Sequence, residues 1–353
     1  MMKILHSADW HLGAPIRGYS PEQTRLLRRE MSAIPQRLAR LCRDRRCDMI
    51  LLSGDLFDGP CSRDAQQAVA AALEEAAVPV FIAPGNHDHI WEKSPYYTEV
   101  WPENVHIFKH SAMESVVLEE LDCRVYGGAF TMPEAHGMLE GFQAEGSERY
   151  AVAVLHGDPG AVSSPYCPVT AAQVRESGLD YLALGHIHAA GSFRAGATLA
   201  AWPGCAMGHG FDETGEKGAL VVTLDQQAEA EFVPLHGIRF YDVESGPGED
   251  PASKLPAMES RDFIRLTLTG HREPPDLERL RRELSRFPNL ILRDRSRPMV
   301  DIWADAGQDS LQGTFFGILR EASRNQDAET VRTLELAAKI ARQILLGQEV
   351  ELP

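Results

Sequence analysis

The chain has 353 residues, 44% of them hydrophobic, and a formal net charge of −16 at pH 7. This composition provides for a sizeable core, and the length predicts about two domains. No apolar run approaches the roughly 18 residues of a membrane span. The amino terminus also has no signal-peptide pattern, so we expect a cytoplasmic protein with no membrane partner.

Five apolar, β-branched runs predict buried strands, and each run ends in a polar motif. In chain order the motifs are Asp9–His11 after KILHS, Gly54–Asp58 after MILLS, Gly85–Asp88 after VFIAP, His156–Asp158 after AVAVL and Gly185–His188 after YLAL. Polar groups at the carboxyl ends of strands in an open α/β sheet converge on one crevice. We therefore expect the five motifs to form one site.

Helix signals lie between the predicted strands. They are a capping box at Ser20–Gln23 with a break at Pro35, a helical segment at Leu38–Arg46, an N-cap at Ser62 for a helix to Ala77, and a capping box at Thr170–Gln173. Short strands with turns follow between Val105 and Phe130. We assign these to a second sheet, together with Gly218–Leu224 and Glu231–Pro234, which predicts a sandwich of two sheets flanked by helices.

A turn-rich stretch, Ser245–Pro251, marks a change of domain. Beyond it we predict a strand at Phe263–Leu268, a helix at Asp276–Phe287 and a strand at Leu290–Leu292, and then helices at Leu311–Ala322 and Ala328–Leu346. We divide the chain into residues 1–238, 239–305 and 306–353 on this basis. The terminal helices either pack on their own domain or provide a docking surface, and their apolar spacing fits both.

The polar motifs supply seven candidate metal ligands: Asp9, His11, Asp55, Asn86, His156, His186 and His188. Carboxylate, imidazole and amide groups without thiolate suit Mn²⁺, Fe or Zn. One ion with an open position takes roughly three or four protein ligands, so the set predicts two ions with one carboxylate between them. Such a pair can clamp both oxygens of a phosphoryl displacement. His87 is then free to act as an acid or to bind phosphate.

At these residues the sequence resembles the calcineurin-type metallophosphoesterase superfamily. Within it, the chain is similar to the SbcD nucleases of double-strand-break repair and to their shorter YhaO-like branch. The segment Trp202–Val222 resembles the stretch that follows the metal site in this branch, although Cys205 and His209 replace an expected Ser and Arg. The resemblance covers roughly the first 235 residues strongly. It implies a four-layer αββα sandwich with a small C-terminal α+β capping domain.

The resemblance also implies a role for each motif residue. Asp9, His11 and His188 would bind the first metal, Asp55 would bridge, and Asn86, His156 and His186 would complete the second site. His87 would be the catalytic histidine, and Asp88 would orient it. The two divalent ions would be Mn²⁺, with Fe, Zn or Mg as alternatives.

The acidic net charge is unusual for a DNA enzyme, because duplex binding relies on Lys and Arg. Between Arg261 and Met299, however, ten arginines stand against six acidic residues. We take Arg279, Arg281 and Arg282 as candidate DNA contacts, together with Arg17 after the first motif. The alternative, a solvated helix face with ordinary ion pairs, carries equal weight.

We therefore predict a two-metal phosphodiesterase that acts on DNA, a Mn²⁺-dependent exonuclease or endonuclease of DNA repair. Its partners would be DNA and an SbcC-like coiled-coil ATPase, with a homodimer as a further option. The alternatives are a phosphatase or cyclic-nucleotide phosphodiesterase of the same superfamily, and a protein that tethers DNA ends. Gly59 and Pro60 follow Asp58 where protein phosphatases of this fold carry Arg, which counts against a protein phosphatase.

Several tryptophan, histidine and cysteine side chains allow more than one interpretation. Trp10 could stack on a base or form a wall of the site. His89 could touch substrate, although an ordinary loop histidine is favoured, and His209 belongs to no motif. The six cysteines include no C-x-x-C pair, so we expect reduced thiols.

Overall fold

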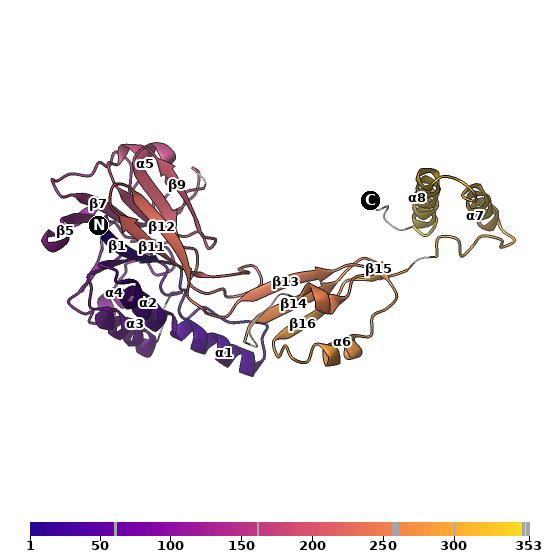
Figure 1. The fold of residues 1–353 in the computed structure, drawn as a ribbon, viewed down its shortest axis with the longest axis horizontal. Coiled ribbons are helices and arrows are strands. Elements are labelled where there is room, and N and C mark those ends of the chain that lie inside the picture. The colour runs from indigo at the N-terminus through magenta and orange to yellow at the C-terminus, as the bar shows by residue number, and fades with distance from the viewer. Residues whose placement is uncertain (60–61, 161, 256–260, 300, 348–349, 351–353) are drawn as a thin grey trace. The chain divides into compact units, whose positions relative to one another are not determined.

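A computed structural model describes residues 1–59, 62–160, 162–255, 261–299, 301–347 and 350 (Figure 1). The chain divides into two compact units. The first contains Met1–Val243 with the described parts of Pro256–Arg265 and Ser285–Ile291, and the second contains Glu244–Leu255, Leu266–Leu284 and the described part of Leu292–Pro353. No helix among the described residues is long and apolar enough to cross a membrane.

The first unit is built on two six-stranded sheets. The first sheet has the order β12-β11-β1-β2-β3-β4, with β1 Met2–Ser7, β2 Met49–Leu52, β3 Val80–Ile82, β4 Val105–Ile107, β11 Gly218–Leu224 and β12 Ala228–Pro234. Strands β1 to β4 are parallel, as expected where helical crossovers connect successive strands.

The assignment of β11, β12 and β4 to the second sheet was wrong. Strand β11 pairs antiparallel with β1, and β12 pairs antiparallel with β11, so both extend the first sheet (Figure 1). The almost fully buried sequence GALVVTL of β11 fits an interior position beside β1. Burial by itself does not identify the neighbouring strand, which is why the sequence pattern could not choose the sheet.

The second sheet has the order β5-β6-β7-β8-β10-β9. Its strands are β5 Glu114–Leu118, β6 Cys123–Gly127, β7 Tyr150–His156, β8 Tyr181–Gly185, β9 Gly191–Ala195 and β10 Thr198–Trp202. Successive side chains of β7 enter different cores: Val152 and Val154 join the cluster shared with the first sheet, whereas Ala153 and Leu155 join a separate cluster. This period of two shows that the sheet is covered on both faces.

Helices cover the outer faces of both sheets. They are α1 Pro21–Ser32, α2 Ile34–Arg45, α3 Arg63–Ala76, α4 Pro95–Thr98 and α5 Ala171–Glu176, with a 3₁₀ turn η1 at Glu119–Leu121. Leu27, Leu38 and Leu73 pack into the core of the first sheet, and Val174 packs on the outer face of the second. The predicted four-layer αββα sandwich is thereby confirmed (Figure 1).

The helix starts that were predicted from N-capping residues are confirmed. Ser20 and Thr170 each form a capping box, and the Ser62 side chain accepts the N–H of Ala65. The first helix breaks at Ala33, and α2 restarts with Pro35 in its first turn, four residues before the predicted segment. Proline is well suited to that position because its missing N–H has no helical partner there.

A buried polar link joins the two sheets below the motifs. The ring of His6 in β1 lies 2.7 Å from the hydroxyl of Tyr181 in β8 and 2.7 Å from the hydroxyl of Ser53. Burial lowers the pKa of His6 to about 3, so the ring is neutral and its two nitrogens serve one donor and one acceptor. These contacts therefore connect Ser53, at the start of the turn that carries Asp55, with strands of both sheets.

The remaining strands and helices belong to the C-terminal part of the chain. A three-stranded sheet has the order β13-β14-β16, with β13 Phe240–Ser245, β14 Phe263–Leu268 and β16 Leu290–Asp294. The other elements are η2 Pro251–Lys254, β15 His271–Arg272, α6 Leu277–Glu283, β17 Arg297–Pro298, α7 Leu311–Ala322 and α8 Ala328–Leu345. Helix α6 ends four residues before the predicted Phe287. The division at residues 238 and 305 remains a prediction.

Candidate metal centre

The five polar motifs lie at the carboxyl ends of strands from both sheets. Asp9 follows β1, Asp55 follows β2 and Asn86 follows β3, all in the first sheet. His156 is the last residue of β7, and His186 directly follows β8, both in the second sheet. The site therefore lies where the edges of two sheets meet within the first unit, whereas the sequence led us to expect the edge of one sheet.

The motif loops hold non-glycine residues in an unusual backbone conformation. Asp9, His11, Asp55 and His186 have φ of 53°, 46°, 52° and 84°. Each such residue costs on the order of 1–3 kcal/mol, and strain of this kind gathers at functional sites. Gly85 leaves room for this arrangement, because a Cβ there would lie 2.3 Å from Oδ1 of Asp55.

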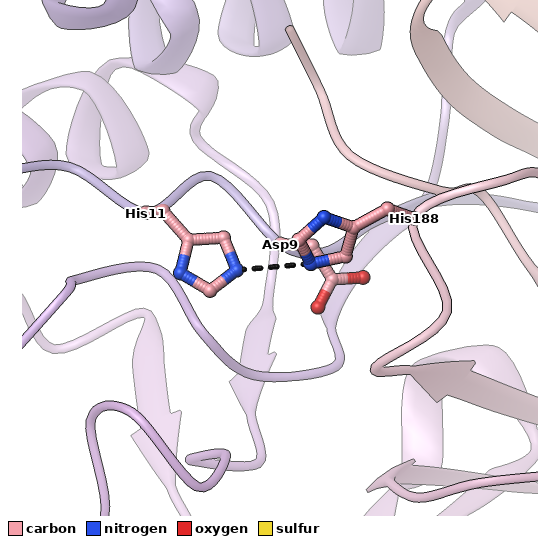
Figure 2. Close-up of side chains that lie close together, drawn as sticks. All are labelled: Asp9, His11 and His188. Atoms are coloured by element: carbon pink, nitrogen blue, oxygen red, sulfur yellow. Dashed lines mark hydrogen bonds between the residues drawn. The ribbon is translucent and has the colours of Figure 1, made fainter. Parts of the chain in front are cut away.

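Asp9, His11 and His188 form the first group of candidate ligands (Figure 2). Their ligand atoms lie within 4.8 Å of one another, and Nε2 of His11 lies 3.2 Å from Nε2 of His188. One oxygen of Asp9 accepts the N–H of His186 at 3.0 Å, while Oδ2 is buried and has no hydrogen-bond partner. A buried, unpartnered carboxylate oxygen beside two imidazoles fits a bound cation.

His156 provides the clearest test of whether a cation fits. Its Nδ1–H donates to the backbone carbonyl of Ser53 at 2.9 Å, and burial lowers the pKa of His156, so Nε2 carries a lone pair. That lone pair faces Oδ1 of Asn86 at 2.9 Å and Oδ2 of Asp55 at 3.4 Å. Three acceptors that face one another repel, and a divalent cation between them converts the repulsion into coordination.

Asp55 lies between the two groups of ligands. Its Oδ2 is 3.8 Å from Nε2 of His11 and 3.4 Å from Nε2 of His156, and its Oδ1 accepts the N–H of His87 at 2.9 Å. Burial, followed by the charge of Asp88, raises the pKa of Asp55 to about 8. This position is the one that a bridging carboxylate requires.

His186 lies beside the second group. Its ring is 5.3 Å from the ring of His156 and 4.7 Å from the ring of Tyr166, measured between centroids. Burial, and then the neighbouring His156, lowers the pKa of His186 to about 4, so the ring is neutral and has a lone pair to offer a metal. Among the described residues, His186 is in none of the groups whose ligand atoms lie within 4.8 Å of one another.

His87 and Asp58 form an exposed pair at the edge of the site. The Nδ1–H of His87 donates to Oδ1 of Asp58 at 2.6 Å, and the His87 side chain is 47% exposed. Asp58 also lies 3.7 Å from Nδ1 of His11, and the interactions of Asp58 with His11 and then with His87 lower the pKa of Asp58 to about 2. The sequence analysis did not include Asp58 among the site residues, although Asp58 is the last residue of the motif Gly54–Asp58.

Asp88 accepts hydrogen bonds from the backbone of two motif loops and from the hydroxyl of Tyr96. Its two oxygens accept four backbone N–H groups and one hydroxyl, those of Asp55, Leu56, Phe57, Gly85 and Tyr96. These five donors fill the acceptor capacity of one carboxylate. Asp88 therefore fixes the two loops that carry Asp55 and Asn86, and Asp58 takes the position beside the ring of His87.

The structure also places the residues with open interpretations. Trp10 is fully buried and donates its indole N–H to Ser7, which makes it a wall of the site rather than a stacking platform. His89 approaches the backbone carbonyl of Asn86 at 3.2 Å. His209 contacts Glu213, which in turn contacts His188. The loop after β10 that carries His209 and Glu213 was not predicted to reach the metal centre.

Three of the four exposed candidate DNA contacts lie on α6, and the fourth, Arg17, precedes α1. Arg279 pairs with Glu283 at 2.7 Å and Arg281 pairs with Glu278 at 2.8 Å. Arg17 and Arg282 are exposed. Five cysteines are free and buried, namely Cys42, Cys47, Cys123, Cys167 and Cys205, whereas Cys61 lies outside the described residues.

Comparison with known proteins identifies relatives over most of the chain. Residues 2–190 match the family model described as calcineurin-like phosphoesterase. The uncharacterized metallophosphoesterase YhaO of Bacillus subtilis is 26% identical over 379 aligned positions, which cover 95% of this chain and 90% of that protein. The SbcD component of the nuclease SbcCD of Staphylococcus epidermidis is 25% identical over 313 positions, which cover 78% of this chain and 81% of that protein. A crystal structure of a dimetal phosphatase from Danio rerio matches with a TM-score of 0.41 and 13% identity, and covers 65% of this chain and 95% of its own.

Proposed function

The chain belongs to the calcineurin-like phosphoesterase family, whose members hydrolyse phosphoesters with two divalent metals, and on this premise we propose that it is a two-metal phosphodiesterase that cleaves DNA. One observation carries the metal-dependent part of the proposal. His156 Nε2, Asp55 Oδ2 and Asn86 Oδ1 face one another as acceptors without a donor between them. A divalent cation between these three atoms would be coordinated by all of them, which favours a metal at this position.

The proposed ligand sets follow from the two groups. Asp9, His11 and His188 would hold the first ion, and Asn86, His156 and His186 the second, with Asp55 shared. Oxygen and imidazole donors without thiolate favour Mn²⁺, and Fe, Zn or Mg are the alternatives. When bound, the pair of ions would supply a nucleophilic hydroxide and polarise the phosphate.

His87 would be the general acid. Asp58 holds its Nδ1–H at 2.6 Å, which leaves Nε2 of the exposed ring for the leaving oxygen of a substrate. Asp58 holds the ring in one orientation, and a proton on Nε2 would pass from His87 to the leaving group.

DNA as the substrate is supported by two weaker observations. The relatives that are named as components of a nuclease are 23–25% identical to this chain, and the region from Arg261 to Met299 is rich in arginine. We further propose a cytoplasmic location and an SbcC-like coiled-coil ATPase as partner, docked on the terminal helices. Exposed apolar side chains on α7 and α8 support the docking proposal, namely Leu311, Phe315, Ile318, Ile344 and Leu345. A homodimer is the alternative partner for the same surface.

The proposal is tested by comparing three substrates with and without added Mn²⁺: linear duplex DNA, single-stranded DNA and the chromogenic diester bis(p-nitrophenyl) phosphate. We expect hydrolysis of all three, lost in EDTA and restored by Mn²⁺. His156→Ala, which removes one of the three facing acceptors, serves as the inactive control. Hydrolysis of the chromogenic diester without cleavage of either DNA would contradict DNA as the substrate and retain the phosphodiesterase, whereas no metal-dependent hydrolysis at all would contradict both.

A further inference from the structure

Glu213 lies on the segment between β10 and β11, outside the residues that match the family model. Its side chain is 12% exposed. One oxygen, Oε1, accepts a short hydrogen bond from the Nδ1–H of His188. The other, Oε2, accepts the backbone N–H of His209 at 2.7 Å and its ring Nδ1–H at 3.1 Å. One oxygen of the carboxylate is thus held by His209, and the other contacts the candidate metal ligand His188.

This contact decides which nitrogen of His188 can bind a metal. Because a carboxylate only accepts, the proton of the neutral ring resides on Nδ1, and Nε2 keeps its lone pair. Nε2 then faces Asp9 and lies 3.2 Å from Nε2 of His11 (Figure 2). Metal-bound histidines generally donate their other ring N–H to such an acceptor, which fixes the tautomer and the direction of the ring.

The same segment also holds the backbone of His188. The ammonium group of Lys217 donates to the carbonyl oxygen of His188 at 3.3 Å. Burial alone would raise the pKa of Glu213, but the hydrogen bonds from His188 and His209 outweigh it and hold the pKa well below its usual range. Glu213 therefore accepts from the ring of His188, Lys217 donates to its main chain, and His209 holds Glu213 in place.

A different role for Glu213 would be direct binding of a third ion with His188 and Cys205, whose ligand atoms lie within 4.8 Å of one another. Two facts argue against this. Cys205 is fully buried, so an ion at its sulfur would have no open position for a substrate or water. Glu213 and His188 are also bonded directly to each other, which leaves no space between them for an ion.

We infer that Glu213 is a positioning residue for the first metal site, which acts by holding His188 so that Nε2 faces Asp9 and His11. This inference rests on the proposed two-metal function. It adds a residue of the C-terminal half of the first unit to a site whose candidate ligands all lie within residues 9–188.

The test is a Mn²⁺ titration by calorimetry on the full chain. In Glu213→Gln, we expect one of the two ions to bind roughly 10–100-fold more weakly, as is typical for the loss of such a partner, and the other to keep its affinity. Glu216→Gln is the matched control. It makes the same change three residues along the same segment, at a glutamate that is 47% exposed and pairs with Arg239, and we expect no effect on either ion.

A double-mutant cycle separates positioning from a general role in the loop. If Glu213 acts through His188, Glu213→Gln has no further effect on metal affinity in a His188→Gln background. Additive losses, equal losses at both ions, or unchanged binding in Glu213→Gln would each overturn the inference. Glu213→Asp, which keeps the charge but withdraws it by one methylene, repeats the measurement if Glu213→Gln fails to fold. Wild-type protein that binds no Mn²⁺ would instead contradict the proposed function itself.

Discussion

Asp58 and Asp88 end two neighbouring motifs, yet their carboxylates have different partners. Asp88 is buried and accepts backbone N–H groups from two loops, so its contribution is to the geometry of the site. Asp58 is partly exposed and contacts the rings of His11 and His87. At the residue scale, Asp58 therefore fixes the ring of His87, on which the proposed proton transfer would depend, and Asp88 fixes the position of the ligand loops.

His87 is expected to carry chemistry rather than metal affinity. His87→Asn should lower kcat on a phosphodiester by roughly 10²–10⁴ while both ions remain bound, because a general acid typically contributes that factor. The measurement combines steady-state kinetics with metal counting by mass spectrometry. His89→Asn, two residues along the same loop, is the matched control and should retain activity. Loss of an ion in His87→Asn would contradict the assignment.

Asp55 is expected to affect both ions, because its Oδ2 lies near ligands of both groups. Asp55→Asn should weaken the binding of both Mn²⁺ ions and reduce the rise in melting temperature that Mn²⁺ produces, since a ligand that binds the native state stabilises it. Melting curves with and without Mn²⁺, and a Mn²⁺ titration, measure these effects. Asp64→Asn, at an exposed position in α3, is the control. Full loading with the full rise in melting temperature would rule out the bridging role.

At the scale of elements, helix α6 is informative because its arginines are both exposed and paired. Arg279–Glu283 and Arg281–Glu278 are i,i+4 and i,i+3 ion pairs on the surface. Pairs of this kind contribute only about 0.3–0.5 kcal/mol to stability, so the charges can be reversed without unfolding the helix. The arginines are also free to exchange a glutamate for a phosphate. Contacts alone therefore do not separate a DNA-binding face from a solvated one.

Charge reversal separates these two interpretations. Changing Arg279, Arg281 and Arg282 to Glu should impair cleavage of long DNA and leave a small chromogenic diester unaffected, because only DNA extends beyond the metals. In a plot of the logarithm of DNA affinity against the logarithm of salt concentration, the slope should become shallower by roughly 0.9 for each lost phosphate contact. The matched control reverses three exposed arginines, Arg320 of α7, Arg324 of the turn that follows and Arg332 of α8. Equal loss in both triple variants would show a general charge effect, and no loss in either would leave α6 as a solvated face.

At the scale of the whole molecule, the site concentrates buried acidic groups in a chain that already carries a net charge of −16. Burial raises the pKa of Asp9, and burial followed by the charge of Asp88 raises the pKa of Asp55 to about 8. A bound cation would lower the pKa of both carboxyl groups again, because it favours their charged form. Metal binding should therefore change how stability depends on pH.

For Asp55 the folded-state pKa of about 8 lies above the ordinary value of 3.8. The folded state thus binds the proton more tightly, and the stabilisation is complete below about pH 4 and lost as the pH rises through 8. Without metal, the melting temperature should fall between pH 7 and 8, a window in which histidines with lowered pKa are already neutral. Asp55→Asn should remove this fall, and saturating Mn²⁺ should suppress it in the wild type. Melting curves in EDTA and in Mn²⁺ check the prediction, and an equal fall in wild type and Asp55→Asn would contradict it.

Much of the local structure could be predicted from the sequence, because it depends on neighbouring residues. The ends of β1, β2, β3, β7 and β8, and the helix starts at Ser20, Ser62 and Thr170, follow from apolar runs and capping side chains. The motif residues Asp9, His11 and His188 also come together as their strand-end positions suggested.

Contacts between distant residues were decided only by the tertiary structure. The pairing of β11 with β1, the contact of Asp58 rather than Asp88 with His87, and the approach of Glu213 to His188 join parts of the chain that are 25 or more residues apart. Hydrophobic pattern and capping chemistry act over a few residues, so they leave such partners open. Only the face-to-face packing of the two sheets brings the ends of their strands together and selects which carboxylate faces which imidazole.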